Sequence, residues 1–157
     1  MTEVTPADSG QDREIRMRFM RIDTKTGELL REFWKIVEPA LPEVLEGFYR
    51  HVTREPQLAR LIGSDIPRLK AAQQSHWARL FNGRFDHEYM QGVRTIGLIH
   101  NKIGLEPRWY IGGYNFVLSQ LAALAVRHYR WKPVHLAAVL TALNCAVLLD
   151  MDIAISV

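Results

Sequence analysis

One histidine, His100, stands in the apolar segment RTIGLIHNKIGL (residues 94–105) and is the residue whose surroundings most suggest chemistry. On a helix, its face is shared by the residues three and four positions away, which are Ile96, Gly97, Ile103 and Gly104. The two isoleucines would supply apolar walls, and the two glycines would leave space beside the imidazole. A flat, bulky ligand lying against this face would explain both the open space and the buried nitrogen.

Haem fits this description, because its iron takes a neutral imidazole as an axial ligand. The alternative is a core histidine hydrogen-bonded to a backbone carbonyl, and the spacing alone favours that alternative. A glycine inside a helix costs about 1 kcal/mol relative to alanine, so Gly97 needs a local reason. The spacings HxxxH and CxxC and paired carboxylates are missing around His100, so the sequence gives zinc or di-iron sites no support.

Tyr49 is a second candidate, in the segment LPEVLEGFYRHV (residues 41–52). It continues an apolar stripe with Leu45, Phe48 and Val52, so its ring is expected to point inward. A buried tyrosine hydroxyl needs a hydrogen-bond partner. That partner is either a backbone carbonyl in an ordinary core or a ligand atom, and the pattern does not separate the two.

Helical periodicity runs through the chain after a polar start, and no stretch alternates with the period of a strand. Residues 1–11 are expected to be disordered, and residues 12–157 to form one all-α domain of seven or eight helices. A new helix is expected at Pro42, because proline suits a first helical turn. Expected helices cover residues 14–22, 27–41, 42–55, 56–63, 66–81, 87–104, 107–130 and 133–157.

Composition bounds the class of protein. A chain of 157 residues with 48% hydrophobic residues suits one soluble globular domain. Its 20 basic and 17 acidic residues form no dense basic block, so no nucleic-acid partner is expected. The single cysteine, Cys145, excludes an internal disulfide and suits a reducing compartment. The start has no secretory signal and the apolar run 136–149 is too short to span a bilayer, so a cytoplasmic location without membrane insertion is expected.

Three segments together resemble the sensor globin domain of globin-coupled sensors, the haem-containing oxygen sensors of bacteria and archaea. They are LEGFYRHV (45–52), HWARLFNGRFDHEY (76–89) and IGLIHNKIGLEPRWYIGGY (96–114). The third is the most specific, and the similarity extends from about residue 14 to the end of the sequence. The final helix ends without a stop signal, so it either frays or continues in a longer protein carrying a C-terminal output domain.

The resemblance implies a globin-like fold with an extra N-terminal helix and a shortened distal region. It also implies haem b (iron protoporphyrin IX), reversible binding of O2 and also of CO and NO, and a homodimer through the last two helices. His100 falls on the iron ligand, Tyr49 on the distal tyrosine, and Tyr110 on a proximal tyrosine that passes on the signal. The other residues expected at the cofactor are Phe48, Leu69, Ala72, Ile96, Ile103 and Trp109.

The distal helix departs from the family pattern. Ala72 stands where some members carry a threonine or serine, and it can form no hydrogen bond. Tyr49 is therefore expected to be the main distal donor, with Gln73 as a possible second polar group. His76 is expected to make a structural hydrogen bond rather than to act at the ligand.

The resemblance implies that the chain is a sensor domain and not an enzyme. The output domain would lie outside this chain, and a chemotaxis transducer is expected in preference to a diguanylate cyclase or a kinase. An apolar stripe of the last helix is expected to contribute to the dimer interface, or else to pack inside one subunit: Leu136, Val139, Leu140, Leu143 and Val147. A haem enzyme, such as a nitric oxide dioxygenase or peroxidase, would need a distal base or a reductase partner. A cofactor-free dimerisation module is the remaining alternative.

Overall fold

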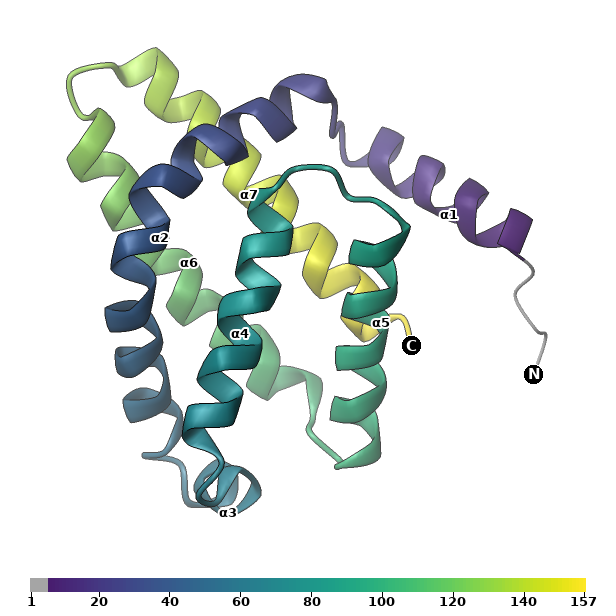
Figure 1. The fold of residues 1–157 in the computed structure, drawn as a ribbon, viewed down its shortest axis with the longest axis vertical. Helices are drawn as coiled ribbons and strands as arrows, with labels where there is room; N and C mark the ends of the chain where they lie inside the picture. Colours follow the sequence, from purple (N-terminus) through teal and green to yellow (C-terminus); the bar gives the residue numbers. More distant parts are fainter. Residues whose placement is uncertain (1–5) are drawn as a thin grey trace.

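Seven α-helices make up the secondary structure of residues 6–157, the part of the chain that this computed structural model describes (Figure 1). Among these residues there is no strand, so the prediction of an all-α fold is confirmed. The helices are α1 (Pro6–Phe19), α2 (Thr24–Val52), α3 (Pro56–Ile62), α4 (Ile66–Phe81), α5 (His87–Lys102), α6 (Pro107–Tyr129) and α7 (Pro133–Ile155).

Helix α2 is continuous where the sequence predicted two helices. It runs for 29 residues with Pro39 and Pro42 inside it, so the predicted start of a new helix at Pro42 is wrong. A proline removes one helical hydrogen bond and bends the helix axis. The helix can continue past it where the residues before and after the proline are packed in the core. Here Val37 and Leu41 are fully buried on either side of Pro39, and Figure 1 shows α2 changing direction along its length.

Helix α1 reaches further towards the N-terminus than expected. It begins at Pro6, inside the segment 1–11 for which disorder was expected, and residues 1–5 lie outside the described residues. The last turn of α1 is anchored by Arg16, which forms ion pairs with Asp12 and with Asp152 of α7. Asp12 also pairs with Arg94 of α5 at 3.3 Å. An anchored turn lowers the cost of adding further turns, because helix propagation is easier than nucleation.

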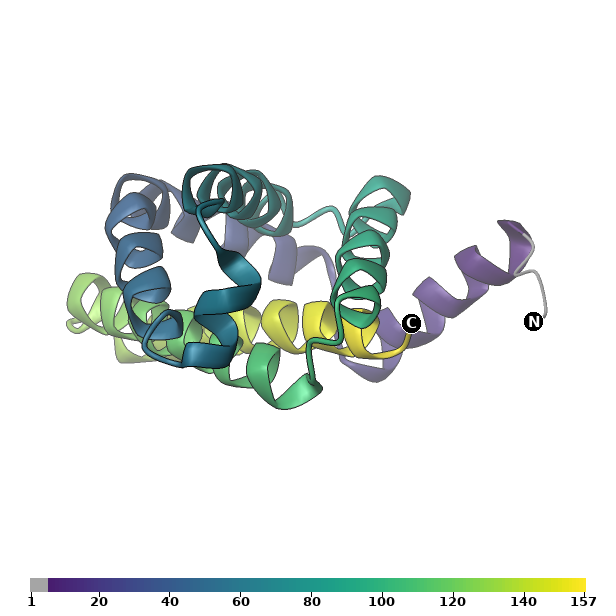
Figure 2. The ribbon, with the colours of Figure 1, turned by 90° about the horizontal axis from the view of Figure 1, so that it is seen from below.

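Helices α4 and α5 pack against different helices of the fold. Helix α4 packs mainly against α2, and α5 packs mainly against α7, while α6 contacts both α2 and α7 (Figures 1 and 2). Fully buried side chains fill the space between them, including Phe33, Leu80, Phe81, Val93, Leu121 and Leu143. The short helix α3 lies between α2 and α4 in the chain, joined to α2 by residues 53–55 and to α4 by residues 63–65.

Helix α7 turns a different face to solvent from the one predicted for a dimer. Val139, Leu143 and Val147 are almost fully buried in the core, so that stripe packs inside the subunit, and Leu136 and Leu140 are half-buried against it. The exposed positions between the two ends of α7 are Val134, Ala137, Thr141, Asn144 and Leu148, and the end residues Pro133 and Ile155 are exposed as well. By length and composition α7 could cross a membrane, but half of its most apolar window is buried within the fold.

Candidate functional site

His100 lies in the last turn of α5, where its ring meets α6. The Asp86 side chain caps the start of α5 by accepting a hydrogen bond from the Tyr89 amide, and Ile103 ends the helix. The imidazole is half-buried and stacks on the phenol ring of Tyr110, with ring centroids 5.3 Å apart and planes at 28°. Burial lowers the pKa of His100, so the imidazole is neutral at pH 7, the form that ligates a metal.

The hydrogen-bonding state of His100 separates the two interpretations of this residue. Its Nδ1 is buried and has no hydrogen-bond partner among the described residues, so it is not a core histidine held by a carbonyl. Trp109, the neighbour of Tyr110, has the same property at its Nε1 atom. Leaving a buried donor or acceptor unsatisfied costs about 1–3 kcal/mol, and both such side chains stand where α5 meets α6. This corner therefore has the character of a ligand site.

The two glycines beside His100, for which the sequence predicted clearance, differ in their surroundings. A Cβ at Gly97 would lie 2.5 Å from the Ala154 carbonyl oxygen and 2.5 Å from Val157 Cγ2, so this glycine allows close contact with the end of α7. Gly104 follows the helix with a φ of 73°, which glycine adopts without strain. The clearance interpretation is therefore wrong for Gly97, whereas a Cβ at Gly104 would meet no atom within 4 Å, so the space beside Gly104 is open. Ile96 is half-buried and Ile103 is 47% exposed, so both remain available as apolar walls.

The residues expected on the distal side lie on α2 and α4. Tyr49 is buried on α2, and its hydroxyl oxygen accepts a hydrogen bond from Gln73 Nε2 of α4 at 3.0 Å. Gln73 Oε1 in turn accepts from Trp77 Nε1 at 3.1 Å. Because the indole nitrogen can only donate, Gln73 must turn its oxygen towards Trp77 and its amide nitrogen towards Tyr49. The Tyr49 proton is therefore left for another acceptor.

Burial raises the pKa of Tyr49, against a smaller lowering by the Gln73 hydrogen bond, so the phenol stays protonated and able to donate. Phe48 stands edge-on to Tyr49, with centroids 4.9 Å apart, and packs against Gly113 of α6, where a Cβ would come within 3.2 Å of its ring. On α4, Leu69 is half-buried and Ala72 is exposed. Among the residues expected on the distal side, Tyr49 is thus the one well-defined hydrogen-bond donor, and Phe48, Leu69 and Ala72 are apolar.

His76 makes the structural hydrogen bond that was predicted, and its partner is a residue that sequence reasoning missed. Its Nε2 lies 2.9 and 3.0 Å from the carboxylate oxygens of Asp150 on α7. Asp150 is fully buried and also accepts hydrogen bonds from the hydroxyls of Tyr89 and Tyr114. Burial, and then the Asp150 charge, raise the pKa of both tyrosines well above its usual value, so both remain donors. The signal in the sequence was a lone aspartate on the same helical face as Leu143 and Val147.

Residues 11–157 match the family model described as Protoglobin. The chain belongs to the protoglobin family. Among solved structures, this protoglobin chain is similar to the globin domain of the Geobacter sulfurreducens globin-coupled sensor, with a TM-score of 0.84 and 20% identity over 90% of this chain and 93% of that one. That likeness confirms the predicted globin fold.

A curated relative is the heme-based aerotactic transducer HemAT of Halobacterium salinarum, 29% identical over 114 residues. The match takes in 70% of this protoglobin chain but only 23% of the length of the transducer. Together with the family match, these findings confirm the predicted resemblance to sensor globin domains.

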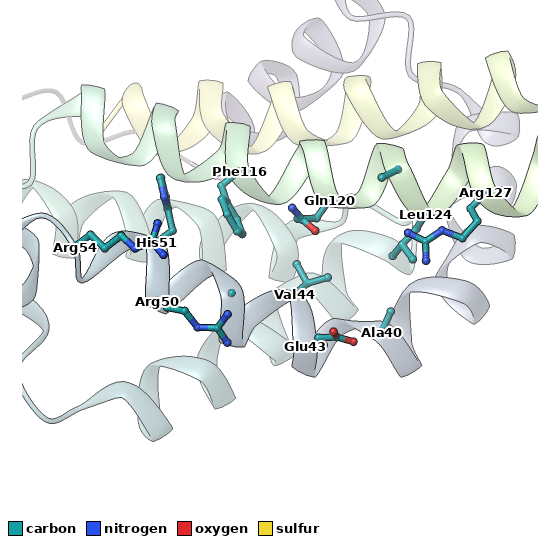
Figure 3. Close-up of a pocket in the computed structure, with 12 residues that line it drawn as sticks. Ala40, Glu43, Val44, Arg50, His51, Arg54, Phe116, Gln120, Leu124 and Arg127 are labelled. Carbon is teal, nitrogen blue, oxygen red and sulfur yellow. The ribbon is translucent and has the colours of Figure 1, made fainter.

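A groove of about 450 Å³ opens elsewhere on the protoglobin fold, between α2 and α6 (Figure 3). In it, Phe116 of α6 stacks on His51 of α2, with ring centroids 5.0 Å apart. Its walls also carry Arg50, Arg54 and Arg127. None of the residues predicted for the cofactor lines this groove, so it is separate from the His100 corner.

Proposed function

We propose that this chain is the gas-sensing domain of a signalling protein, which binds haem b through His100 and responds to O2. The observation that carries the proposal is the neutral, half-buried imidazole of His100, which has an unsatisfied Nδ1 and stacks on Tyr110 within a protoglobin fold. No hydrogen bond from Nδ1 to the described residues fixes the imidazole as an ordinary core histidine, and a neutral imidazole has a ring nitrogen able to ligate iron.

Haem b fits the residues present at this corner. His100 would be its axial ligand, with Ile96 and Ile103 as apolar contacts and Trp109 and Tyr110 on the same side. Phe48, Leu69 and Ala72 would face it from α2 and α4. Bound haem supplies a ferrous iron with an open position that takes O2, CO or NO.

Tyr49 is the residue suited to favour O2 among these gases. Its hydroxyl oxygen is occupied by Gln73 Nε2, which leaves the hydroxyl proton free to donate to a polar ligand. A neutral hydrogen bond contributes about 1 kcal/mol net, and CO offers a weaker acceptor than O2. His76 is held by Asp150 and is not free to serve as a distal base, which favours a sensor over a peroxidase-like enzyme.

The signal would leave the domain through a homodimer formed by α6 and α7. The exposed residues of α7, Val134, Ala137, Thr141, Asn144 and Leu148, recur at spacings of three and four, which is the pattern of a helix seam. Neighbouring α6 exposes a matching row of apolar or small polar side chains, Ile111, Asn115, Ser119, Ala123 and Val126. A second copy packed on these two rows would cover both.

The output would lie in a longer protein, in the cytoplasm, and a chemotaxis transducer is the output we favour over a diguanylate cyclase or a kinase. The name of the Halobacterium relative, an aerotactic transducer whose length this chain matches only in part, supports that choice. The lone cysteine, Cys145, is free, which suits a reducing compartment.

The test is the absorption spectrum of the purified protein after haem reconstitution, with and without O2. Wild-type protein should bind haem stoichiometrically, and the ferrous spectrum should change reversibly with O2. His100→Ala should lose the pigment or bind it without histidine ligation, and added imidazole should restore the spectrum. His87→Ala, an exposed histidine of the same helix, is the matched control. Pigment and gas uptake at wild-type levels in His100→Ala would refute the proposal.

A further inference from the structure

Asp150 of α7 connects four helices through one carboxylate. Its side chain is fully buried and accepts hydrogen bonds from His76 of α4, Tyr89 of α5 and Tyr114 of α6. The three donors therefore come from the distal helix, from the helix that carries His100, and from the helix that carries Tyr110. Each of these helices is tied to α7 at the same point.

Stability alone does not account for a carboxylate in this position. Taking a charge out of water is costly, and replacing buried ionic groups by apolar residues of similar volume is often neutral or stabilising. What a fully hydrogen-bonded buried group adds is a fixed register between the elements it joins. Here, three donors with defined directions fix how α4, α5 and α6 are turned relative to α7.

The hydrogen bond from Tyr114 connects Asp150 to the part of α6 that contacts His100. Tyr110 and Tyr114 are four residues apart on α6 and so share one face of that helix. Tyr110 stacks on His100, while Tyr114 donates its hydroxyl hydrogen to Asp150. A rotation of α6 that moved Tyr110 would therefore strain the bond from Tyr114 to Asp150.

The same stretch of α6 also touches the distal side. Gly113 lies against the ring of Phe48, the neighbour of Tyr49, and a Cβ at Gly113 would come within 3.2 Å of that ring. On α4, His76 follows Gln73 by three residues, so the second arm of Asp150 fixes the helix that orients Tyr49. The helices that carry the residues of both walls are thus hydrogen-bonded to one carboxylate, through His76, Tyr89 and Tyr114.

We propose that Asp150 is a positioning residue that sets the ring of Tyr110 against His100 through Tyr114 and carries movements of that pair to α7. This inference rests on the proposed function. Asp150 faces the core from α7, while Leu148, two residues earlier and on the opposite side of the helix, lies in the exposed row proposed for the dimer. A shift of His100 would thereby be passed to Tyr110 by their ring contact, and from Tyr114 to Asp150 by their hydrogen bond, and so reach the dimer face of α7.

The experiment compares haem-loaded wild-type protein with Tyr114→Phe, which removes one hydroxyl and keeps the ring. Tyr129→Phe is the matched control, because Tyr129 lies on the same helix and also donates its hydroxyl to a carboxylate, that of Glu32, at 3.0 Å. Resonance Raman spectra of the ferrous proteins report the iron–histidine stretching frequency. Amide hydrogen exchange over residues 141–155, with and without CO, reports whether gas binding reaches α7.

In wild type and in Tyr129→Phe, we expect the same iron–histidine frequency and a change in α7 exchange when CO binds. In Tyr114→Phe, the frequency should shift and the response of α7 to CO should be lost. Asp150→Asn, which keeps the size of the side chain but replaces one acceptor with a donor, should act in the same direction. It is also the second variant should Tyr114→Phe take up haem poorly.

Each other outcome counts against a specific claim. A Tyr114→Phe protein that matches wild type in both measurements overturns the role of Asp150, and so does an equal effect of Tyr129→Phe, which would show general loosening. A wild type that binds CO without any change in α7 exchange also overturns it. A wild type that takes up no haem refutes the proposed function itself, and the inference falls with it.

Discussion

Gln73 Nε2 donates a hydrogen bond to the hydroxyl oxygen of Tyr49 at 3.0 Å, which joins α4 to α2 on the distal side. The direction of this bond is fixed by Trp77, whose Nε1 donates to Gln73 Oε1 at 3.1 Å. Gln73, expected from the sequence as a possible second contact to the ligand, instead has both ends of its amide engaged by side chains. It leaves the Tyr49 proton as the free donor, and this arrangement has consequences that can be measured.

Tyr49→Phe should raise the O2 dissociation rate of the haem-loaded protein about fivefold, because it removes one hydrogen bond of about 1 kcal/mol to the gas. CO dissociation should change much less, since CO is a weaker acceptor. Stopped-flow replacement of bound O2 by CO measures the O2 dissociation rate. Replacement of bound CO by NO measures the CO dissociation rate. An unchanged O2 dissociation rate would remove Tyr49 from the distal site.

Gln73→Leu should lower the free energy of unfolding by about 1–3 kcal/mol, because the Trp77 indole N–H loses its acceptor inside the fold. Urea denaturation of wild type and variant measures the difference. The control is Gln74→Leu, an exposed neighbour on the same helix, for which a change within about 0.5 kcal/mol is expected. Equal effects of the two substitutions would mean that the hydrogen bond from Trp77 adds nothing to stability.

Gly97→Ala and Gly112→Ala should change stability in opposite directions. A Cβ at Gly97 would lie 2.5 Å from the Ala154 carbonyl oxygen, so overpacking should cost about 1–3 kcal/mol. At Gly112 no atom lies within 4 Å of the added methyl, so the higher helix propensity of alanine should add up to about 1 kcal/mol. Thermal or urea unfolding tests both. A tolerated Gly97→Ala would show that α5 and α7 can separate without cost.

Leu148→Glu should convert the proposed dimer into monomers, because it places a charge on the exposed row of α7, where Leu148 is 49% exposed. Leu61→Glu is the control: Leu61 is 45% exposed, but it lies on α3, away from α6 and α7. Sedimentation velocity at a series of concentrations measures both variants. If Leu148→Glu remains dimeric, the dimer interface lies on another surface or includes another helix.

The amino-acid sequence alone determined the helical fold and most helix boundaries. Asp86 before α5 and the prolines that open α3, α6 and α7 act through local backbone geometry, which a sequence shows directly. The sequence also singled out His100, because a histidine among isoleucines and glycines is locally conspicuous. Pro42 misled the same reasoning, since core contacts on both sides of a proline decide whether the helix continues.

Only the tertiary structure decided which partner each buried group has. From the sequence, Gly97 was interpreted as leaving space for a ligand, but in the fold it packs against α7. The apolar stripe of α7 that was expected to contribute to a dimer interface lies in the core. Asp150 appeared only as the end of an apolar run, yet it accepts hydrogen bonds from residues 74, 61 and 36 positions away. Local propensity depends on neighbours in the chain, whereas packing and hydrogen bonding depend on which distant helices meet, and that information is absent from any short stretch of sequence.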